Sequence, residues 1–241
     1  MRYEPFPIGV AHPVFDPGTY DRMLASYPPI ERFVYLPKVG HKYSLSEKSN
    51  PKEFKAWIDA HPEWREFHRT VKRREFPYEV LETLRNNHVD LGIKQRSDWQ
   101  QFNKRLRNLL RGRGGRDEWP LNARFEYSML PADGGFVSPH TDSPGKIVTM
   151  VVSMVENGGW DTAIGGGTDI NSPKKPELYF NEVNRRADFD DMNVLDTFEF
   201  GPNQCVMFIK TFNSWHSVRP MTAPGSKAMR KSLTINIEAG R

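Results

Sequence analysis

The sequence is poor in cysteine and has no long hydrophobic run. Cys205 is the only cysteine among 241 residues, so a disulfide framework is excluded. It lies in the apolar stretch 204–209, where a buried thiol is the simplest expectation. No apolar run approaches the length of a membrane span, and residues 1–5 do not open a secretory signal. We therefore expect a cytoplasmic protein without a membrane partner.

Charge of either sign is not in large excess. Lys and Arg number 34 against 30 Asp and Glu, giving a net charge of +4. Much of the basic excess lies in 72–74 and 94–116, which is compatible with a nucleic-acid partner. However, apolar residues from Trp99 to Leu110 recur at helical spacing between a capping Ser97 and Gly112. The spacing predicts an amphipathic helix over 98–111 with a solvated basic face, which makes nucleic acid the less favoured partner.

Histidine is scarce in the second half of the chain. Of the seven histidines, only His140 and His216 follow position 88. On a β-strand, residues two apart share a face, so His140 and Asp142 are expected to point the same way. A second strand carrying His216 would complete a face of two imidazoles and one carboxylate. That donor set, with positions left open, is typical of non-haem Fe(II) that activates oxygen.

The chain divides into a helical front and a stranded back. Asp16-Pro17 and Asn50-Pro51 are helix-start signals, and breaks are expected near Pro62 and Pro77. We expect residues 1–119 to form a helical support region packed on a core of residues 120–241, within one structural domain. Short runs rich in β-branched and aromatic residues predict the strands of that core, at 121–130, 135–142, 146–155, 194–200, 204–210, 215–219 and 230–237. The predicted fold class is mainly β with flanking helices, built on a double-stranded β-helix (jelly-roll) core.

Three motifs resemble those of the 2-oxoglutarate- and Fe(II)-dependent dioxygenases, especially the prolyl-4-hydroxylase-like branch. They are His140-Thr141-Asp142, then His216-Ser217-Val218-Arg219-Pro220, then the run from Arg230 to Ile235. The resemblance covers about residues 120–240. It implies a hydroxylase that consumes O2 and 2-oxoglutarate and releases succinate and CO2. Asp142 favours hydroxylation, because related halogenases lack a carboxylate at that position.

The resemblance also implies roles for individual residues. His140, Asp142 and His216 would hold Fe(II), and Arg230 would bind the distal carboxylate of 2-oxoglutarate as a planar bidentate fork. Further candidates for the cosubstrate pocket are Ser232, on the same strand face as Arg230, with Thr149 and Tyr127. For Thr149 and Tyr127, an ordinary place in the core is the alternative.

Other functions remain open at this point. In the nucleic-acid demethylases of the superfamily the closing strand ends on a second arginine, where this chain has Asn236. A non-catalytic jelly-roll binding protein would be expected to have lost a ligand or Arg230, and a cupin-type enzyme would have no use for Arg230. The leading substrate is a small molecule or a peptidyl residue. The loops 131–135 and 157–174 and the side chain of Arg219 are candidates for substrate contact, and the sequence leaves the oligomeric state open.

Overall fold

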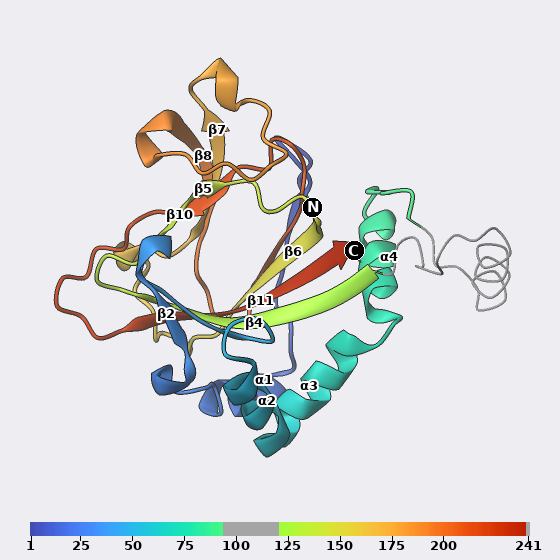
Figure 1. Ribbon diagram of the computed structural model, residues 1–241, viewed down its shortest axis with the longest axis vertical. Coiled ribbons are helices and arrows are strands. Elements are labelled where there is room, and N and C mark those ends of the chain that lie inside the picture. Colours follow the sequence, from blue (N-terminus) through green and yellow to red (C-terminus); the bar gives the residue numbers. More distant parts are fainter. Residues whose placement is uncertain (94–120, 240–241) are drawn as a thin grey trace, which may run out of the picture.

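The computed structural model describes residues 1–93 and 121–239 (Figure 1). The helix predicted over 98–111, with its cap Ser97 and stop Gly112, lies outside the described residues. Within the described residues, no helix combines the length and the apolar character that a membrane span requires.

Two antiparallel sheets form the core. The larger sheet has seven strands in the order β1-β9-β6-β11-β4-β3-β2. The smaller sheet has four, in the order β5-β10-β7-β8. The larger sheet comprises β1 (Ile8–Ala11), β2 (Val34–Leu36), β3 (Lys42–Ser46), β4 (Leu121–Pro131), β6 (Lys146–Ser153), β9 (Cys205–Ile209) and β11 (Met229–Ala239). The smaller sheet comprises β5 (Val137–His140), β7 (Thr168–Pro173), β8 (Met192–Phe198) and β10 (His216–Val218). The predicted class, mainly β with flanking helices, is confirmed.

Two parts of the sheets were not predicted. The front of the chain supplies β1, β2 and β3 to the larger sheet, so this region is not wholly helical. The segment 157–174, expected to be a loop, contains the six residues of β7. β1, β2 and β7 do not show a clear alternation of polar and apolar residues, which is the signal that predicts a strand, whereas β3 shows it over only five residues.

The helices begin where the sequence places proline. The α-helices are α1 (Pro17–Ala25), α2 (Pro51–Ala60), α3 (Pro62–Lys72) and α4 (Phe76–Asn86), each with proline in its first turn. At the start of α1, the Asp16 side chain accepts a hydrogen bond from the Thr19 backbone N–H at 3.0 Å. The breaks predicted near Pro62 and Pro77 are confirmed. Short 3-10 helices are η1 (Ile30–Arg32), η2 (Pro37–Val39), η3 (Thr162–Ile164), η4 (Pro176–Leu178) and η5 (Phe189–Asp191).

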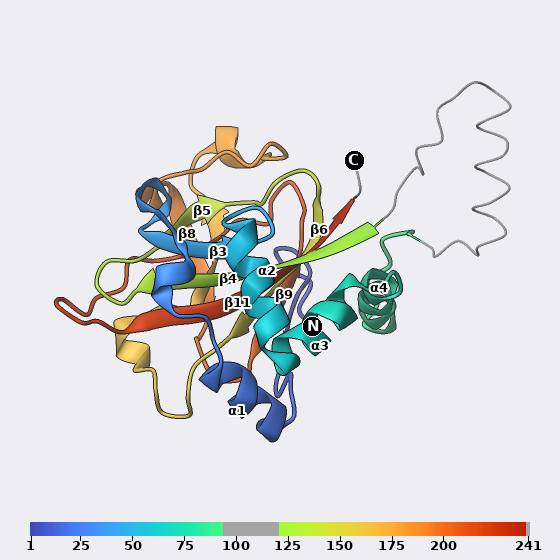
Figure 2. The same ribbon diagram turned by 60° about the horizontal axis from the view of Figure 1, so that its bottom comes forward.

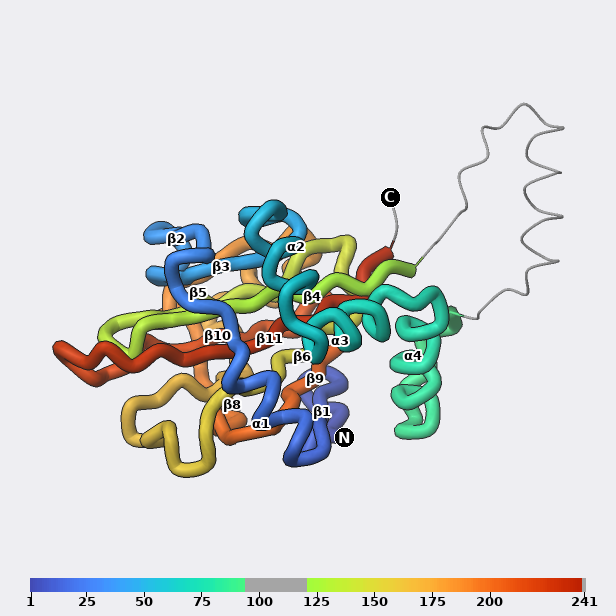
Figure 3. Tube along the Cα trace, turned by 90° about the horizontal axis from the view of Figure 1, so that it is seen from below, coloured from blue at the N-terminus to red at the C-terminus, as the bar shows by residue number. Residues whose placement is uncertain are grey.

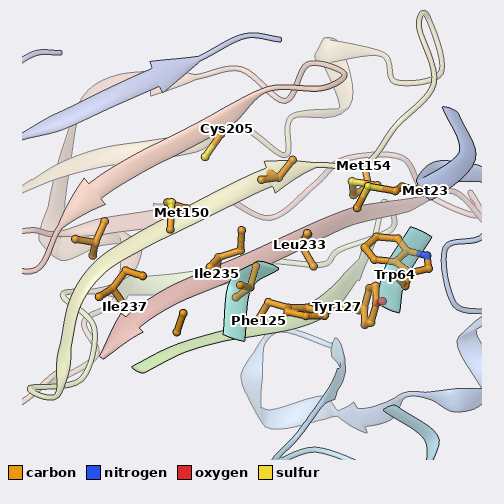
Figure 4. Packing of buried hydrophobic residues seen from close by; sticks show 14 of the residues in the cluster. Met23, Trp64, Phe125, Tyr127, Met150, Met154, Cys205, Leu233, Ile235 and Ile237 are labelled. Carbon is orange, nitrogen blue, oxygen red and sulfur yellow. The ribbon is translucent and has the colours of Figure 1, made fainter. Parts of the chain in front are cut away.

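The outer face of the larger sheet packs against these helices. Figures 2 and 3 show α2 and α3 lying along one side of the larger sheet, next to β4 and β11. Alternate residues of β4, β11, β6 and β9 point outward and join Trp64 of α3 in one hydrophobic cluster (Figure 4). Cys205 belongs to this face, and burial raises its pKa to about 12, so the thiol is inert. The shared cluster supports the proposal that the front region serves as a support layer.

The inner face of the larger sheet turns toward the smaller sheet. Near β1 and β9 it is apolar, where Phe6, Ile8 and Phe208 pack with Ile170 of β7. Along β6 and β11 it is polar and buried, with Thr149, Ser153, Arg230, Ser232 and Asn236. A polar interior between two sheets is costly unless the groups have partners. The polar inner face is therefore the part of the larger sheet that is suited to bind a ligand.

Candidate metal and cosubstrate site

Two histidines meet across neighbouring strands of the smaller sheet. His140 ends β5 and His216 begins β10, and the two are direct partners in the strand pairing. Their ring centroids lie 4.2 Å apart. Residues paired across antiparallel strands carry side chains on the same face, so both imidazoles point into the space between the sheets.

Asp142 joins them by a route that the sequence did not predict. Strand β5 ends at His140, so Asp142 does not share a strand with it. Instead, Asp142 lies in the following turn with a left-handed backbone, φ +71°. This turn returns its carboxylate to the histidines. Asp142 Oδ1 lies 3.5 Å from His140 Nε2, and Oδ2 lies 3.9 Å from His216 Nε2. One ligand atom from each of the three residues falls within 4.8 Å of the others.

Both imidazoles are held with the same nitrogen turned toward Asp142. Nδ1 of His140 lies 2.9 Å from the Ser138 carbonyl, and Nδ1 of His216 lies 2.9 Å from the Ser214 carbonyl. A carbonyl only accepts, so each Nδ1 carries the proton and each neutral Nε2 keeps a lone pair. Fixing the tautomer through the second nitrogen is how proteins prepare histidine for a metal. The three residues therefore fit a divalent cation.

The electrostatics of the site favour a neutral histidine beside an ionised carboxylate. Burial lowers the pKa of His216 to about 3, and the neighbouring His140 acts in the same direction. Burial by itself raises the pKa of Asp142, but His140, the Lys146 ammonium and His216 outweigh it and hold the pKa well below its usual range. A metal binds deprotonated ligands, so Asp142 and His216 are already in the ligating state at neutral pH.

Two further residues hold the Asp142 carboxylate. Lys146 Nζ lies 2.6 Å from Oδ1, and Thr149 Oγ1 donates to Oδ2 at 2.8 Å. Thr149 Oγ1 also lies 3.1 Å from Oδ1 of Asn236 on β11. Thr149, a candidate for the cosubstrate pocket by resemblance, has its hydroxyl against the metal-site carboxylate in the structure. Lys146 was missed, because only the turn at Asp142 brings its side chain to the site.

Arg230 is a buried cation on the inner face of β11. It is 4% exposed, its Nε donates to the Gly166 carbonyl, and its guanidinium lies 4.4 Å from the centre of the Phe200 ring. Burial lowers its pKa to about 10. No carboxylate in the described part of the chain forms an ion pair with it. A buried charge without a counter-ion is costly, so the position favours an anionic ligand.

A glycine turn at 165–167 forms the wall beside Arg230. Gly165 and Gly166 have φ of +91° and +88°. A Cβ on Gly166 would lie 3.3 Å from Arg230 Cδ and 3.1 Å from the Trp160 ring. Glycine is therefore required both by the backbone conformation and by the closeness of the guanidinium.

The inner face of β11 connects the cation to the metal ligands. Ser232 and Thr234 lie between Arg230 and Asn236 on this face, because alternate residues of a strand share a side. The stretch from Arg230 to Asn236 spans about 20 Å at a rise of about 3.3 Å per residue. Ser232 is thus brought to the same face as Arg230, as expected, and Thr234 remains half-buried there.

Tyr127 is not brought to this site. It pairs with Leu233 and points to the outer face, where its ring lies 4.7 Å from that of Trp64. Burial raises the pKa of its hydroxyl well above the ordinary value. The prediction that it contributes to the cosubstrate pocket is therefore corrected. Tyr127 lies three positions along β4 from Leu130, the partner of Arg230, and an odd offset puts the side chains of Tyr127 and Arg230 on opposite faces.

Arg219 is already engaged by another residue. Its Nε and one terminal nitrogen bind the two carboxylate oxygens of Asp169 at 3.0 and 3.1 Å. Both residues line a pocket of about 420 Å³ beside the glycine turn. The residues that line this pocket do not include His140, Asp142 or His216, so the pocket is separate from the metal ligands.

A prolyl-4-hydroxylase from Pseudomonas putida aligns with a TM-score of 0.50 at 13% identity, covering 97% of this chain and 93% of that one. The fold is that of the prolyl 4-hydroxylases. A prolyl 4-hydroxylase from Phytophthora capsici aligns with a TM-score of 0.52 at 15% identity, over 97% of this chain and 59% of that one. No protein-family model and no curated protein matches the sequence. The predicted jelly-roll core is thus confirmed, and with it the fold of the branch that the motifs resemble.

Proposed function

We propose that this protein is an Fe(II)- and 2-oxoglutarate-dependent oxygenase that hydroxylates a small molecule or a peptidyl residue. The observation that carries the proposal is the convergence of His140 Nε2, His216 Nε2 and the Asp142 carboxylate within 4.8 Å inside this fold. Two imidazoles and one carboxylate on a single face leave positions on the metal for a cosubstrate.

The protein residues supply ligation and orientation. His140 and His216 would hold the iron through Nε2, while their Nδ1 hydrogen bonds to the Ser138 and Ser214 carbonyls stop the rings from turning. Asp142 would ligate through one oxygen, with Thr149 fixing the plane of its carboxylate. When bound, Fe(II) and 2-oxoglutarate let one atom of O2 enter a substrate C–H bond as hydroxyl while the other enters succinate and CO2 is released.

Arg230 supplies the charge that a dicarboxylate needs. Its guanidinium, which forms no ion pair with the described residues, would bind the distal carboxylate of 2-oxoglutarate, and Ser232 on the same face would donate a hydroxyl hydrogen bond. The burial of Arg230, with no carboxylate paired to it among the described residues, supports an anionic cosubstrate. A cupin-type enzyme without 2-oxoglutarate would leave this cation without a role.

A nucleic-acid substrate receives less support. The second arginine of the demethylase pattern is replaced by Asn236, whose carboxamide oxygen lies 3.1 Å from Thr149 Oγ1. Asn236 therefore lies beside Thr149 and does not add a cation at this position. We propose a small-molecule or peptidyl substrate on this basis.

The test is anaerobic binding followed by turnover. Fe(II) and 2-oxoglutarate are added to the metal-free protein, and the visible metal-to-ligand charge-transfer band is recorded. We expect a band in the wild type, no band in Asp142→Ala, and a band that needs far more 2-oxoglutarate in Arg230→Met. Succinate release in air should follow the same order. Iron binding without any band would contradict 2-oxoglutarate use, and absence of iron binding would end the oxygenase proposal.

A further inference from the structure

A second group of charged side chains shares the inner face with the metal site. Arg124 and Glu126 are two residues apart on β4 and so point the same way. Arg124 binds Glu238 of β11 at 2.6 Å and lies 3.8 Å from Glu126, which in turn pairs with Lys42 of β3. We call these four residues, Lys42, Arg124, Glu126 and Glu238, the charged row.

The charged row begins one strand away from the metal-site carboxylate. Asn236 of β11 is paired with Thr149 on one side and with Arg124 on the other. Side chains paired across neighbouring strands have Cβ atoms about 5 Å apart, so Arg124 is the next side chain after Asn236. Thr149 bonds Asp142 directly. The sequence of neighbours is therefore Asp142, Thr149, Asn236 and Arg124.

Lys146 provides a second connection. Its ammonium binds Asp142 at 2.6 Å, and its backbone is paired with Glu238 of the charged row. Its charge also acts on Glu126, together with those of Lys42 and Arg124. The charged row and the candidate metal site are thus parts of one continuous polar surface.

The side chains of the charged row are partly buried, but solvent still reaches them. Side-chain exposure is 14% for Glu126, 15% for Arg124, 22% for Glu238 and 24% for Lys42. Surface ion pairs are far more exposed, as with Arg69 and Glu66 on α3, which are 74% and 62% exposed. A sheltered position strengthens electrostatic interactions with a ligand while still allowing it to enter.

Stability alone does not account for the row. Replacing buried ion pairs by apolar residues commonly leaves a protein as stable or more stable. Nε of Arg124 is buried and has no hydrogen-bond partner in the part of the chain that the structure describes. A buried donor without a partner carries a desolvation cost, which a ligand accepting that hydrogen bond would remove.

The balance of signs indicates the kind of ligand. With Lys146 and Asp142 included, the surface carries three cationic and three anionic side chains. An anion would be repelled by Glu126 and Glu238, and a cation by Lys42 and Arg124. A molecule that carries both charges can exchange partners with each ion pair and leave no charge unmatched.

We propose that the charged row is the prime-substrate subsite and that it takes a small zwitterion of the free amino acid class, whose carboxylate meets Arg124 and Lys42 and whose ammonium meets Glu126 and Glu238. This inference rests on the proposed oxygenase function. It selects a small molecule over a peptidyl residue, because a residue within a peptide has neither charge at its backbone.

The test uses the protein loaded anaerobically with Fe(II) and 2-oxoglutarate. The probes are the twenty free L-amino acids and, for each, its N-acetyl methylamide, which has the same side chain without the two backbone charges. The readouts are a change in the charge-transfer band and probe-dependent succinate release in air. We expect at least one free amino acid to change both, and its blocked form to change neither.

The variants locate the binding to the charged row. For the active amino acid, Arg124→Met should raise the half-saturating concentration at least about tenfold, since truncating one partner of a buried charge pair is costly. Arg69→Met on the surface of α3 is the matched control and should leave it unchanged. If Arg124→Met does not fold by circular dichroism, Lys42→Met with Lys55→Met as control takes its place.

The outcomes separate the two proposals. Absence of the charge-transfer band would overturn the oxygenase function and this inference with it. A normal band that no free amino acid alters, or that blocked and free forms alter equally, would overturn the zwitterion subsite alone. Unchanged half-saturation in the charged-row variants would likewise overturn it.

Discussion

Thr149 donates a hydrogen bond to Asp142, with 2.8 Å between Oγ1 and Oδ2. The two residues belong to different segments, the turn after β5 and the strand β6, and both are buried. This contact fixes the carboxylate that we propose as a metal ligand. Partners of this kind orient a ligand without touching the metal.

Thr149→Val should weaken metal binding. Valine keeps the shape of threonine but cannot donate to Asp142, and loss of such a partner typically costs about 10–100-fold in metal affinity. Titration with Fe(II) under anaerobic conditions measures the effect. Thr83→Val is the matched control, since Thr83 bonds the Glu79 carbonyl on the exposed side of α4. Equal affinities in the two variants would contradict a positioning role for Thr149.

Arg230→Lys should fail to restore 2-oxoglutarate binding. Lysine keeps the positive charge but not the planar fork that binds both carboxylate oxygens. We expect the half-saturating 2-oxoglutarate concentration to rise at least about tenfold in Arg230→Lys, and further in Arg230→Met. Equilibrium titration of the charge-transfer band measures both. A lysine variant that binds as the wild type does would show that charge alone suffices at this position.

The stability of the metal-free protein should fall as the pH drops below about 6.5. Burial lowers the pKa of His216 to about 3, so only the unfolded chain takes up a proton at this residue between those values. The unfolded state then binds more protons, and His216 contributes a loss of about 1.4 kcal/mol per pH unit. Urea unfolding at a series of pH values, with a chelator present, gives the slope. His216→Leu should have a shallower slope, and an unchanged slope would contradict the assignment.

Tyr127→Phe should stabilise the protein without affecting the site. The Tyr127 hydroxyl is buried and has no hydrogen-bond partner within the described residues, so removing it should raise the free energy of unfolding by about 1 kcal/mol. Tyr27→Phe is the contrasting variant, because the Tyr27 hydroxyl bonds the carbonyls of Ser128 and Ser232 and its loss should destabilise. Thermal unfolding compares the two. A weaker 2-oxoglutarate affinity in Tyr127→Phe would restore the original prediction for this residue.

Much of the fold could be read from local patterns. The prolines at 17, 51 and 62 mark helix starts because proline is favoured in a first turn, and these helices begin there. The later strands show β-branched residues in short runs, and each predicted run overlaps a strand. The strands β1, β2, β3 and β7 were missed. β1 pairs with the distant β9 and β3 with the distant β4, so local patterns do not announce these contacts.

The sequence by itself determined the residue types of the site and their chemistry. Two imidazoles and one carboxylate are residue types that bind a metal ion, and an arginine is one that binds a carboxylate. The alternation of side chains along β11 also placed Ser232 on the same face as Arg230. Only the tertiary structure decided how these groups meet. The left-handed turn at Asp142, the contacts of Lys146 and Thr149 with its carboxylate, and the outward direction of Tyr127 depend on strand ends and register. A register shifted by one residue turns every side chain of a strand to the opposite face, and the residue at which a strand ends decides whether the next side chains follow the strand or a turn. Packing between distant segments sets both.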